Sequence, residues 1–305
     1  MKFGKVQDIG QVDFSLPLSP SCNKLFMKEK GVDLKKGSSF FLGCPVWADK
    51  SFVGKIYPRA CRPQDYLNYY GQNFGCIELN STYYALPSKE TLLSWKEKVP
   101  KSFKFCPKVP QEVANEKTLG FGGREVSEFY SRMGEFGPQL GPILLQLGPY
   151  FSTDRWKYLV RFIRSFPKHM TLAIEFRHPE WFLPHNLNKL VMHLRSFGVI
   201  FVITDVAGRR DVCHMALTSL KSMIRFTGNS LDQTDFERIK AWVKTLADWS
   251  RLGLKETFFF IHQPIEGDCV DLAIDFVKNF RLVSNKEILG PVRAREEGQM
   301  GLFYE

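Results

Sequence analysis

The chain has 305 residues, of which 44% are hydrophobic and 24% charged, and its formal net charge is +10. This composition is typical of a globular protein and excludes a disordered, collagen-like or coiled-coil chain. No stretch approaches the roughly 18 apolar residues of a membrane span, and the first residues lack the apolar core of a secretory signal. We therefore expect a cytoplasmic protein with no membrane partner, and its seven scattered cysteines indicate reduced thiols.

The positive charge is spread through the chain and is not gathered in a basic tail. A diffuse positive field favours anionic ligands or nucleic acid. Solubility alone is the alternative explanation.

Secondary structure is predicted from residue 39 onward, where short apolar runs begin to alternate with longer helical patterns. Residues 1–38 are polar and predict no clear element, so we interpret them as an N-terminal extension. The predicted strands are 40–47, 75–80, 103–108, 142–147, 171–177, 199–205, 222–227 and 257–262. The predicted helices are 63–73, 88–98, 123–136, 153–165, 185–197, 232–252 and 268–281, and the link 206–221 predicts a helix only weakly. Residues 282–305 are interpreted as a C-terminal tail.

Strands that alternate with helices predict an α/β fold with parallel strands, because each crossover needs a helix. Eight such units over residues 39–281 match a (β/α)8 TIM-type barrel, which typically has about 250 residues. A doubly wound open sheet is the alternative. It is disfavoured because no GxGxxG turn follows the first strand.

Polar side chains gather at the carboxyl ends of the predicted strands, where barrel enzymes place their active sites. Side chains alternate between the two faces of a strand, and the face opposite the Ile, Leu and Phe residues becomes polar there. We expect the inward ionisable residues to be Glu78, Lys108, Glu175, Arg177, Asp205, Arg225 and His262. Burying such groups without partners is costly, so they are predicted to meet each other, water or a ligand. A structural ion-pair network is the alternative.

The residue types suggest how the work is divided. Arg177 and Arg225 are suited to clamping a phosphate or carboxylate. Glu175 shares a face with Arg177, so we expect its pKa to be lowered. A less well paired Glu78 is expected to have a raised pKa and to act as the acid.

Other chemistries remain open at this point. Two carboxylates also suit a glycosidase, with Trp47, Tyr84, Phe151 and Trp181 as stacking faces. A divalent metal could use Glu78, Glu175, Asp205, His178 and His262, although no HxxxH or HxH spacing is present. Cys44 is either a nucleophile or, as we favour, a small buried residue.

Four blocks, in order, resemble the YecE-like family, also known as domain of unknown function 72. They are IELNSTYYALPSKETLLSW (77–95), FKFCPKVP (103–110), LGPILLQLGPYF (140–151) and IEFRHPEW (174–181). The resemblance implies a TIM-type barrel whose shared polar residues lie at the strand ends, and it implies no established activity. The sequence departs from the family pattern at Thr227, where His is usual, and at the end of the eighth strand, where we expect His262 to replace the lost polar group.

The sequence predicts an enzyme that uses acid/base chemistry on a small phosphate- or carboxylate-bearing substrate, without a metal or another cofactor. The predicted catalytic residues are Glu78, Glu175 and His178. The predicted substrate-binding residues are Asn80, Thr82, Tyr84, Lys108, Gln146, Arg177, Trp181, Asp205, Arg225 and His262. A nucleic-acid-binding or -processing protein that uses the same basic face is the first alternative, and a non-catalytic metabolite-binding protein is the second.

Overall fold

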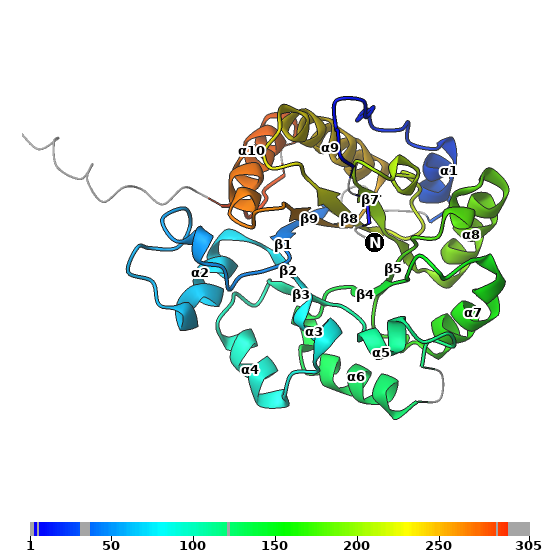
Figure 1. Cartoon of the computed structure of the whole chain (residues 1–305), viewed down its shortest axis with the longest axis horizontal. Helices are drawn as coiled ribbons and strands as arrows, with labels where there is room; N and C mark the ends of the chain where they lie inside the picture. Colours follow the sequence, from blue (N-terminus) through cyan, green and yellow to red (C-terminus); the bar gives the residue numbers. More distant parts are fainter. Residues whose placement is uncertain (1–2, 5, 31–36, 121–122, 285, 292–305) are drawn as a thin grey trace, which may run out of the picture.

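The computed structural model describes residues 3–4, 6–30, 37–120, 123–284 and 286–291. Strands surround a centre and the helices lie outside them (Figure 1). The strands are β1 (Ser39–Cys44), β2 (Cys76–Leu79), β3 (Lys104–Pro107), β4 (Ile143–Gln146), β5 (Leu172–Glu175), β6 (Ile200–Phe201), β7 (Ile203–Asp205), β8 (Lys221–Thr227) and β9 (Glu256–His262). Each predicted strand is therefore present, and the sixth is divided at Val202 into β6 and β7.

All pairs of neighbouring strands are parallel, which confirms the predicted parallel α/β fold. The strands form a six-stranded sheet in the order β3-β2-β1-β9-β8-β7 and a three-stranded sheet in the order β4-β5-β6. The predicted single closed sheet is therefore not what the described residues form. The hydrogen-bonded ladder is interrupted where β3 meets β4 only through isolated bridges and where Val202 separates β6 from β7.

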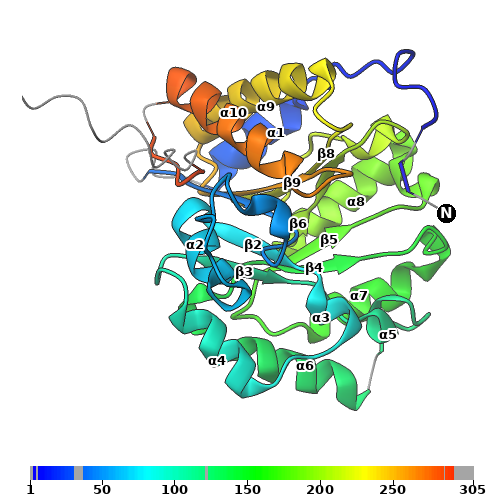
Figure 2. The ribbon, with the colours of Figure 1, turned by 60° about the vertical axis from the view of Figure 1, so that its left-hand side comes forward.

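The helices fall close to their predicted positions and cover the outside of the sheets (Figures 1 and 2). They are α2 (Tyr66–Asn73), α4 (Lys89–Glu97), α6 (Arg124–Gly134), α7 (Trp156–Ser165), α8 (Pro184–Phe197), α9 (Gln233–Leu252) and α10 (Asp268–Val283). Two short helices, α3 (Ser81–Tyr84) and α5 (Gln111–Ala114), follow β2 and β3. Ser88 caps α4, since its hydroxyl accepts a hydrogen bond from Thr91 N.

The weakly predicted helix at 206–221 is absent. This link contains only a 3-10 turn at Arg210–Val212. The expectation of no element before residue 39 is also wrong, because α1 (Ser21–Glu29) is a helix with Phe26 and Met27 buried. These two departures are related, because α1 binds the segment 206–221, which lacks a helix. Asn23 Nδ2 donates to Met215 O at 2.8 Å, and Asn23 Oδ1 accepts from Leu217 N at 2.8 Å.

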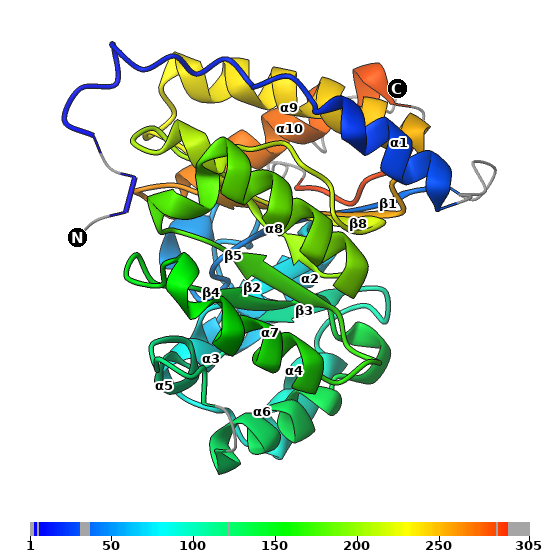
Figure 3. The same cartoon turned by 90° about the vertical axis from the view of Figure 1, so that its right-hand side faces the viewer.

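Helix α1 lies beside α8 and α9 (Figure 3). Arg195 of α8 donates to Asn23, and Trp249 of α9 donates to Ser19 just before α1. In a regular (β/α)8 order, the helix that follows the sixth strand would lie between these two neighbours. An N-terminal segment therefore covers the position that the link 206–221 leaves without a helix.

The buried apolar residues form two clusters that match the predicted strand faces. The larger lies between strands and helices and includes Ile77, Ile174 and Phe259. The smaller consists of side chains on the opposite strand face and lies inside the ring of strands. Its buried members are Cys76, Cys106, Leu144, Ala173, Ile200, Val202, Met223, Phe258 and Phe260. This inner cluster forms the floor beneath the polar strand ends.

Within the described residues, no helix is both long enough and apolar enough to cross a membrane.

Candidate functional site

A buried arginine joins two glutamates at the carboxyl ends of the strands. Arg225 of β8 donates from Nε and Nη2 to the two carboxylate oxygens of Glu78 on β2, each at 2.9 Å. Its Nη1 donates to Glu175 Oε2 on β5 at 2.6 Å. All three guanidinium nitrogens of Arg225 are thus engaged by carboxylates. The predicted proximity of these three residues is confirmed. However, the hydrogen bonds of Arg225 to the two glutamates leave it few donors with which to bind a substrate.

Both glutamates are held as carboxylates. Burial by itself would raise the pKa of Glu78, but Arg225 and then His262 outweigh burial and hold that pKa well below its usual range. Burial is likewise outweighed at Glu175, where Arg225 and Arg177 lower the pKa to about 2. The predicted low pKa of Glu175 is confirmed. The predicted raised pKa of Glu78 is wrong, because Glu78 receives two hydrogen bonds from Arg225 and is therefore no proton donor at neutral pH.

Lys108 lies next to this cluster without a carboxylate partner. Only 8% of the residue is exposed, and its Nζ lies 4.2 Å from the centre of the Tyr83 ring. Within the described part of the chain, no carboxylate oxygen lies within ion-pair distance of Nζ. Burial, followed by the charge of Arg225, lowers the pKa of Lys108 to about 8. Lys108 therefore changes its charge close to neutral pH.

Arg177 and Gln146 complete the contacts of Glu175. Arg177 Nε donates to Glu175 Oε1 at 2.8 Å, and Gln146 Nε2 donates to Glu175 Oε2 at 3.0 Å. The two terminal nitrogens of Arg177 make no hydrogen bond to another described residue. The ring of Phe3, from the N-terminal segment, lies 4.3 Å from the Arg177 guanidinium carbon. Arg177 is thus a partly exposed cation at the edge of the cluster.

Two more polar atoms in the cluster have no hydrogen-bond partner. Thr204 Oγ1 is buried and unpartnered, and Thr204 pairs in register with Arg225, so both side chains leave the same sheet face. His262 Nε2 lies 3.3 Å from Glu78 Oε2 but is not aligned for a hydrogen bond. His262 also pairs in register with Thr227, which places it beside the position where the sequence departs from the family pattern.

The charges of this cluster do not balance. Arg225, Arg177 and a protonated Lys108 are three cations, whereas Glu78 and Glu175 are the two carboxylates that they face. One positive charge is left in a largely buried site, which is costly unless an anion compensates it. Because both glutamates are ionised, neither can serve as the acid of a glycosidase at neutral pH.

Several predicted site residues have structural roles instead. The wholly buried Thr82 hydroxyl accepts from Lys108 N and donates to the carbonyl of Lys108 or Leu79, so it joins the ends of β2 and β3 and is closed to substrate. Trp181 is buried in the outer core and donates to Phe151 O at 2.7 Å. The prediction that Thr82 and Trp181 contact substrate is therefore corrected, because both side chains are buried.

The remaining predicted residues lie at the rim. Tyr84 is 69% exposed and faces solvent, whereas its neighbour Tyr83 contacts Lys108. Asn80 is half-buried, and its side chain makes no hydrogen bond within the described residues. His178 Nδ1 accepts from Glu180 N at 3.3 Å and so caps a 3-10 turn (Pro179–Phe182). This contact occupies Nδ1, so only Nε2 of His178 could act on a substrate. The catalytic role of His178 stays a prediction.

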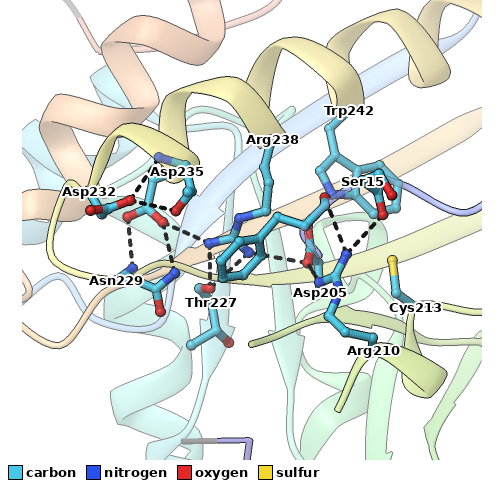
Figure 4. Close-up of polar contacts among 12 residues, drawn as sticks. Ser15, Asp205, Arg210, Cys213, Thr227, Asn229, Asp232, Asp235, Arg238 and Trp242 are labelled. Atoms are coloured by element: carbon cyan, nitrogen blue, oxygen red, sulfur yellow. Dashed lines mark hydrogen bonds and ion pairs between the residues drawn. The ribbon is translucent and has the colours of Figure 1, made fainter. Parts of the chain in front are cut away.

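Asp205 belongs to a separate network beneath α9 (Figure 4). It accepts hydrogen bonds from Trp242 Nε1 at 2.7 Å, from Arg238 Nη1 at 3.1 Å and from Arg210. Arg238 also pairs with Asp235 at 2.7 Å. Asp205 is therefore on the helix-facing side of β7, on the same face as Ile203, and the inward residue of this strand is Thr204. The prediction that Asp205 binds substrate is corrected by this placement.

No three His, Cys, Asp or Glu side chains among the described residues converge as the ligands of a metal ion would. The expectation that the protein works without a metal stays a prediction. All seven cysteines are free, and burial raises the pKa of the Cys44 thiol well above its usual value. This makes Cys44 a buried apolar residue, as favoured from the sequence, and not a nucleophile.

The family model of "Protein of unknown function DUF72" matches residues 41–296, which is most of the chain. The chain belongs to the DUF72 family. This DUF72 protein is 29% identical over 243 residues to UPF0759 protein YecE of Escherichia coli K12, covering 73% of this chain and 86% of the relative. It is 24% identical over 203 residues to UPF0759 protein YunF of Bacillus subtilis, covering 62% and 70% of the two chains.

Solved structures of DUF72 proteins share the fold. A protein from Enterococcus faecalis V583 is similar with a TM-score of 0.64 and 19% identity, covering 80% of this chain and 98% of the other. A protein from Thermotoga maritima is similar with a TM-score of 0.57 and 24% identity, also covering 80% and 98%. The family match begins at residue 41, after α1, so the helix that covers the link 206–221 lies outside the matched region.

Sequence reasoning missed Thr204, Tyr83 and Phe3. Thr204 could have been predicted, because the strand alternation that places Ile203 and Asp205 outward places Thr204 inward. Tyr83 and Phe3 gave no such signal, since neither lies in a strand and each meets the site through a loop or a short helix.

Proposed function

We propose that this DUF72 protein is an enzyme that binds a small substrate carrying a carboxylate or phosphate group at the carboxyl ends of its strands. The observation that carries the proposal is the Lys108 ammonium, which is buried without a counter-ion while Glu78 and Glu175 are already paired with arginines. An anion bound beside Lys108 would balance the remaining positive charge.

The residues divide the work as follows. Lys108 and the terminal nitrogens of Arg177 bind the anionic group, because their donors are not used within the protein. Lys108 is also the acid–base group, since a pKa of about 8 lets it give up and regain a proton near neutral pH. Glu78 and Glu175 fix the orientation of Arg225 and Arg177 and stay ionised.

The proposed site requires the two sheets to act together as a (β/α)8 barrel. Two features support this arrangement. Isolated parallel bridges Phe105↔Leu140 and Lys108↔Leu144 join β3 to β4, and only Val202 separates β6 from β7. Arg225 also spans the interior from β8 to Glu78 on β2 and Glu175 on β5, so side chains tie the two sheets together where backbone ladders do not.

A thermal-shift panel tests the proposal. It would contain small carboxylates, sugar phosphates, nucleotides, short oligonucleotides and divalent metals, each with the wild type, Lys108→Met and Lys104→Met. We expect a carboxylate or phosphate to stabilise the wild type by about 2.7 kcal/mol at 100 times its Kd. The shift should vanish in Lys108→Met and persist in Lys104→Met, which removes the same charge from the far end of β3.

Other outcomes would redirect the assignment. Stabilisation by oligonucleotides alone would favour the nucleic-acid alternative. Stabilisation by a small anion that is recovered unchanged after long incubation would favour the metabolite-binding alternative. Stabilisation that is equal in Lys108→Met would contradict the proposed site.

A further inference from the structure

We propose that Lys108 is a nucleophile that forms an imine with an aldehyde or ketone carrying a carboxylate or phosphate group. This inference rests on the proposed function and narrows its substrate class to anionic carbonyl compounds. It concerns the Nζ atom, which is the primary amine among the described residues of the cluster. When Nζ is neutral and attacks, the terminal nitrogens of Arg177 hold the anionic group.

The charge of Lys108 forms no ion pair within the described residues. The two carboxylates nearest to it in the cluster receive their hydrogen bonds from Arg225, Arg177 and Gln146. A lysine kept for stability would be expected to form an ion pair when more than nine-tenths buried. Lys108 instead rests against the face of the Tyr83 ring.

The surroundings of Lys108 favour its neutral amine. A lysine becomes a usable nucleophile when it is desolvated or lies beside another cation. Lys108 meets both conditions, because its burial and the charge of Arg225 together lower its pKa to about 8 against the opposing charges of Glu78 and Glu175. At neutral pH a fraction on the order of one tenth would then carry a free electron pair, which follows from a pKa of about 8.

Backbone contacts of Lys108 fix the base of its side chain. Lys108 N donates to Thr82 Oγ1 at 2.9 Å, and Lys108 also bridges to Leu144 of β4. The buried Thr82 is therefore a positioning residue for Lys108. A reacting atom is most effective when its geometry is held before the substrate arrives.

The chemistry balances without a redox partner. The electron pair of the neutral Nζ forms a bond to the carbonyl carbon, and the carbon–oxygen π electrons move to oxygen. The oxygen takes up two protons and leaves as water, while the nitrogen gives up its protons as the C=N bond forms. Protonation of the imine nitrogen restores the positive charge beside Glu78 and Glu175. The unpartnered Thr204 Oγ1 and His262 Nε2 are donors or acceptors available for these transfers.

The test is reductive trapping on the intact protein. Wild type, Lys108→Arg and Lys104→Arg are incubated with pyruvate, glyoxylate or dihydroxyacetone phosphate, and sodium borohydride is added. We expect the wild type and Lys104→Arg to gain the mass of the probe less one oxygen atom, on the peptide that contains Lys108. Lys104 is the matched control because it begins β3, which ends just before Lys108, and its Nζ donates to Pro138 O.

Lys108→Arg should lose the adduct while keeping its charge, and its fold is checked by thermal melting. The peptide map of the wild type decides the question even if that variant fails to fold. Trapping should also increase as the pH is raised through about 8, where Lys108 loses its proton. No adduct on the Lys108 peptide between pH 7 and pH 9, or an equal spread over exposed lysines, would overturn the inference.

Calorimetric titration with lactate separates this failure from that of the proposed function. Lactate carries the carboxylate but has no carbonyl group that can form an imine. Lactate binding that depends on Lys108, with no adduct from pyruvate, would leave the anion site in place and overturn only the imine. Absence of both binding and adducts would overturn both.

Discussion

The ammonium of Lys108 lowers the stability of the fold. Its pKa is about 8 in the folded chain, against an ordinary value of 10.5. Between these two values the unfolded chain binds more protons than the folded one, so stability rises as the pH is raised from about 8 to above 10. Below pH 8 the folded protein carries the full penalty of a buried, unpaired charge. Such a penalty is typical of residues kept for function.

Replacing Lys108 by Met should therefore stabilise the protein at pH 7, by up to about 3 kcal/mol. The gain should shrink as the pH approaches 10.5, where the wild-type amine is already neutral. Chemical denaturation of both proteins at pH 7 and pH 10 measures the difference. Equal or lower stability of the variant at pH 7 would mean that the Lys108 charge is compensated within the protein.

Replacing Glu175 by Gln should have the opposite effect. The pKa of Glu175 is lowered to about 2, so the stability it contributes is present above about pH 4.5 and is lost as the pH falls toward 2. Glu175→Gln leaves Arg177 without its carboxylate and Arg225 with one fewer, which should cost about 3–5 kcal/mol at pH 7. The variant should also lose less stability on acidification from pH 5 to pH 2. If the variant lost as much stability between pH 5 and pH 2 as the wild type, the acid sensitivity would come from groups other than Glu175.

Strand alternation predicted the centre of the site because burial on two faces leaves a strand little freedom of register. It placed Glu78, Lys108, Gln146, Glu175 and Arg225 together, and these residues do form one cluster. The prediction was wrong at Asp205, which was placed inward because it is charged, although strand alternation places it outward with Ile203. The partners of Asp205 come from a helix and a link, and no local pattern in the strand reveals them.

At the scale of elements, α1 replaces the helix that the chain lacks after β7. Phe26 and Met27 on this helix are buried, whereas Leu25 between Asn23 and Phe26 is 61% exposed. The segment was not predicted because it has few apolar residues and because Asn23 binds backbone groups of the distant positions Met215 and Leu217.

Phe26→Ala should lower the free energy of unfolding by about 3 kcal/mol, the usual cost of removing a buried aromatic ring. Leu25→Ala, on the exposed side of the same helix, should change it by no more than about 0.5 kcal/mol. Denaturant titration of the two variants measures both values. Equal small effects would show that α1 contributes little to the stability of the strands it covers.

The network around Asp205 joins β7, the 3-10 turn Arg210–Val212 and α9. Asp205→Asn leaves Arg210 without its buried counter-charge and leaves Arg238 with Asp235 alone, so we expect a loss of about 3–5 kcal/mol. Anion binding at Lys108 should be unchanged in the variant that remains folded, because Asp205 faces away from the ring interior. Loss of anion binding without loss of stability would show that Asp205 takes part in anion binding.

At the scale of the whole molecule, the net charge of +10 attracts anions in general and does not select among them. Under the proposed function, selection among anions comes from the charge of Lys108 and from the terminal nitrogens of Arg177. The overall order of strands and helices was predictable because the alternation is regular and each parallel crossover needs a helix. The interruptions of the sheet at β3–β4 and at Val202 were not, since they arise from the fit between strands and leave no mark in composition.

Binding of a small anion should depend only weakly on salt concentration. Nucleic-acid binding would instead weaken steeply, with a slope of about −0.9 per phosphate contacted on duplex DNA. Titrations at two salt concentrations, with a small carboxylate and with a short duplex, distinguish the two partners. Steep dependence with the duplex, together with loss of binding in Lys108→Met, would favour the nucleic-acid alternative over the small-anion site.

The ionisation of Lys108 is the most direct test of the account. Its Nζ signal would be followed by NMR across pH 6 to pH 11 in the free protein and with saturating glycolate or inorganic phosphate, with Lys108→Arg assigning the signal. We predict a pKa of about 8 in the free protein and a rise of about one unit with the anion, since a bound counter-charge favours the ammonium. A pKa near the ordinary lysine value, unmoved by any anion, would contradict the account.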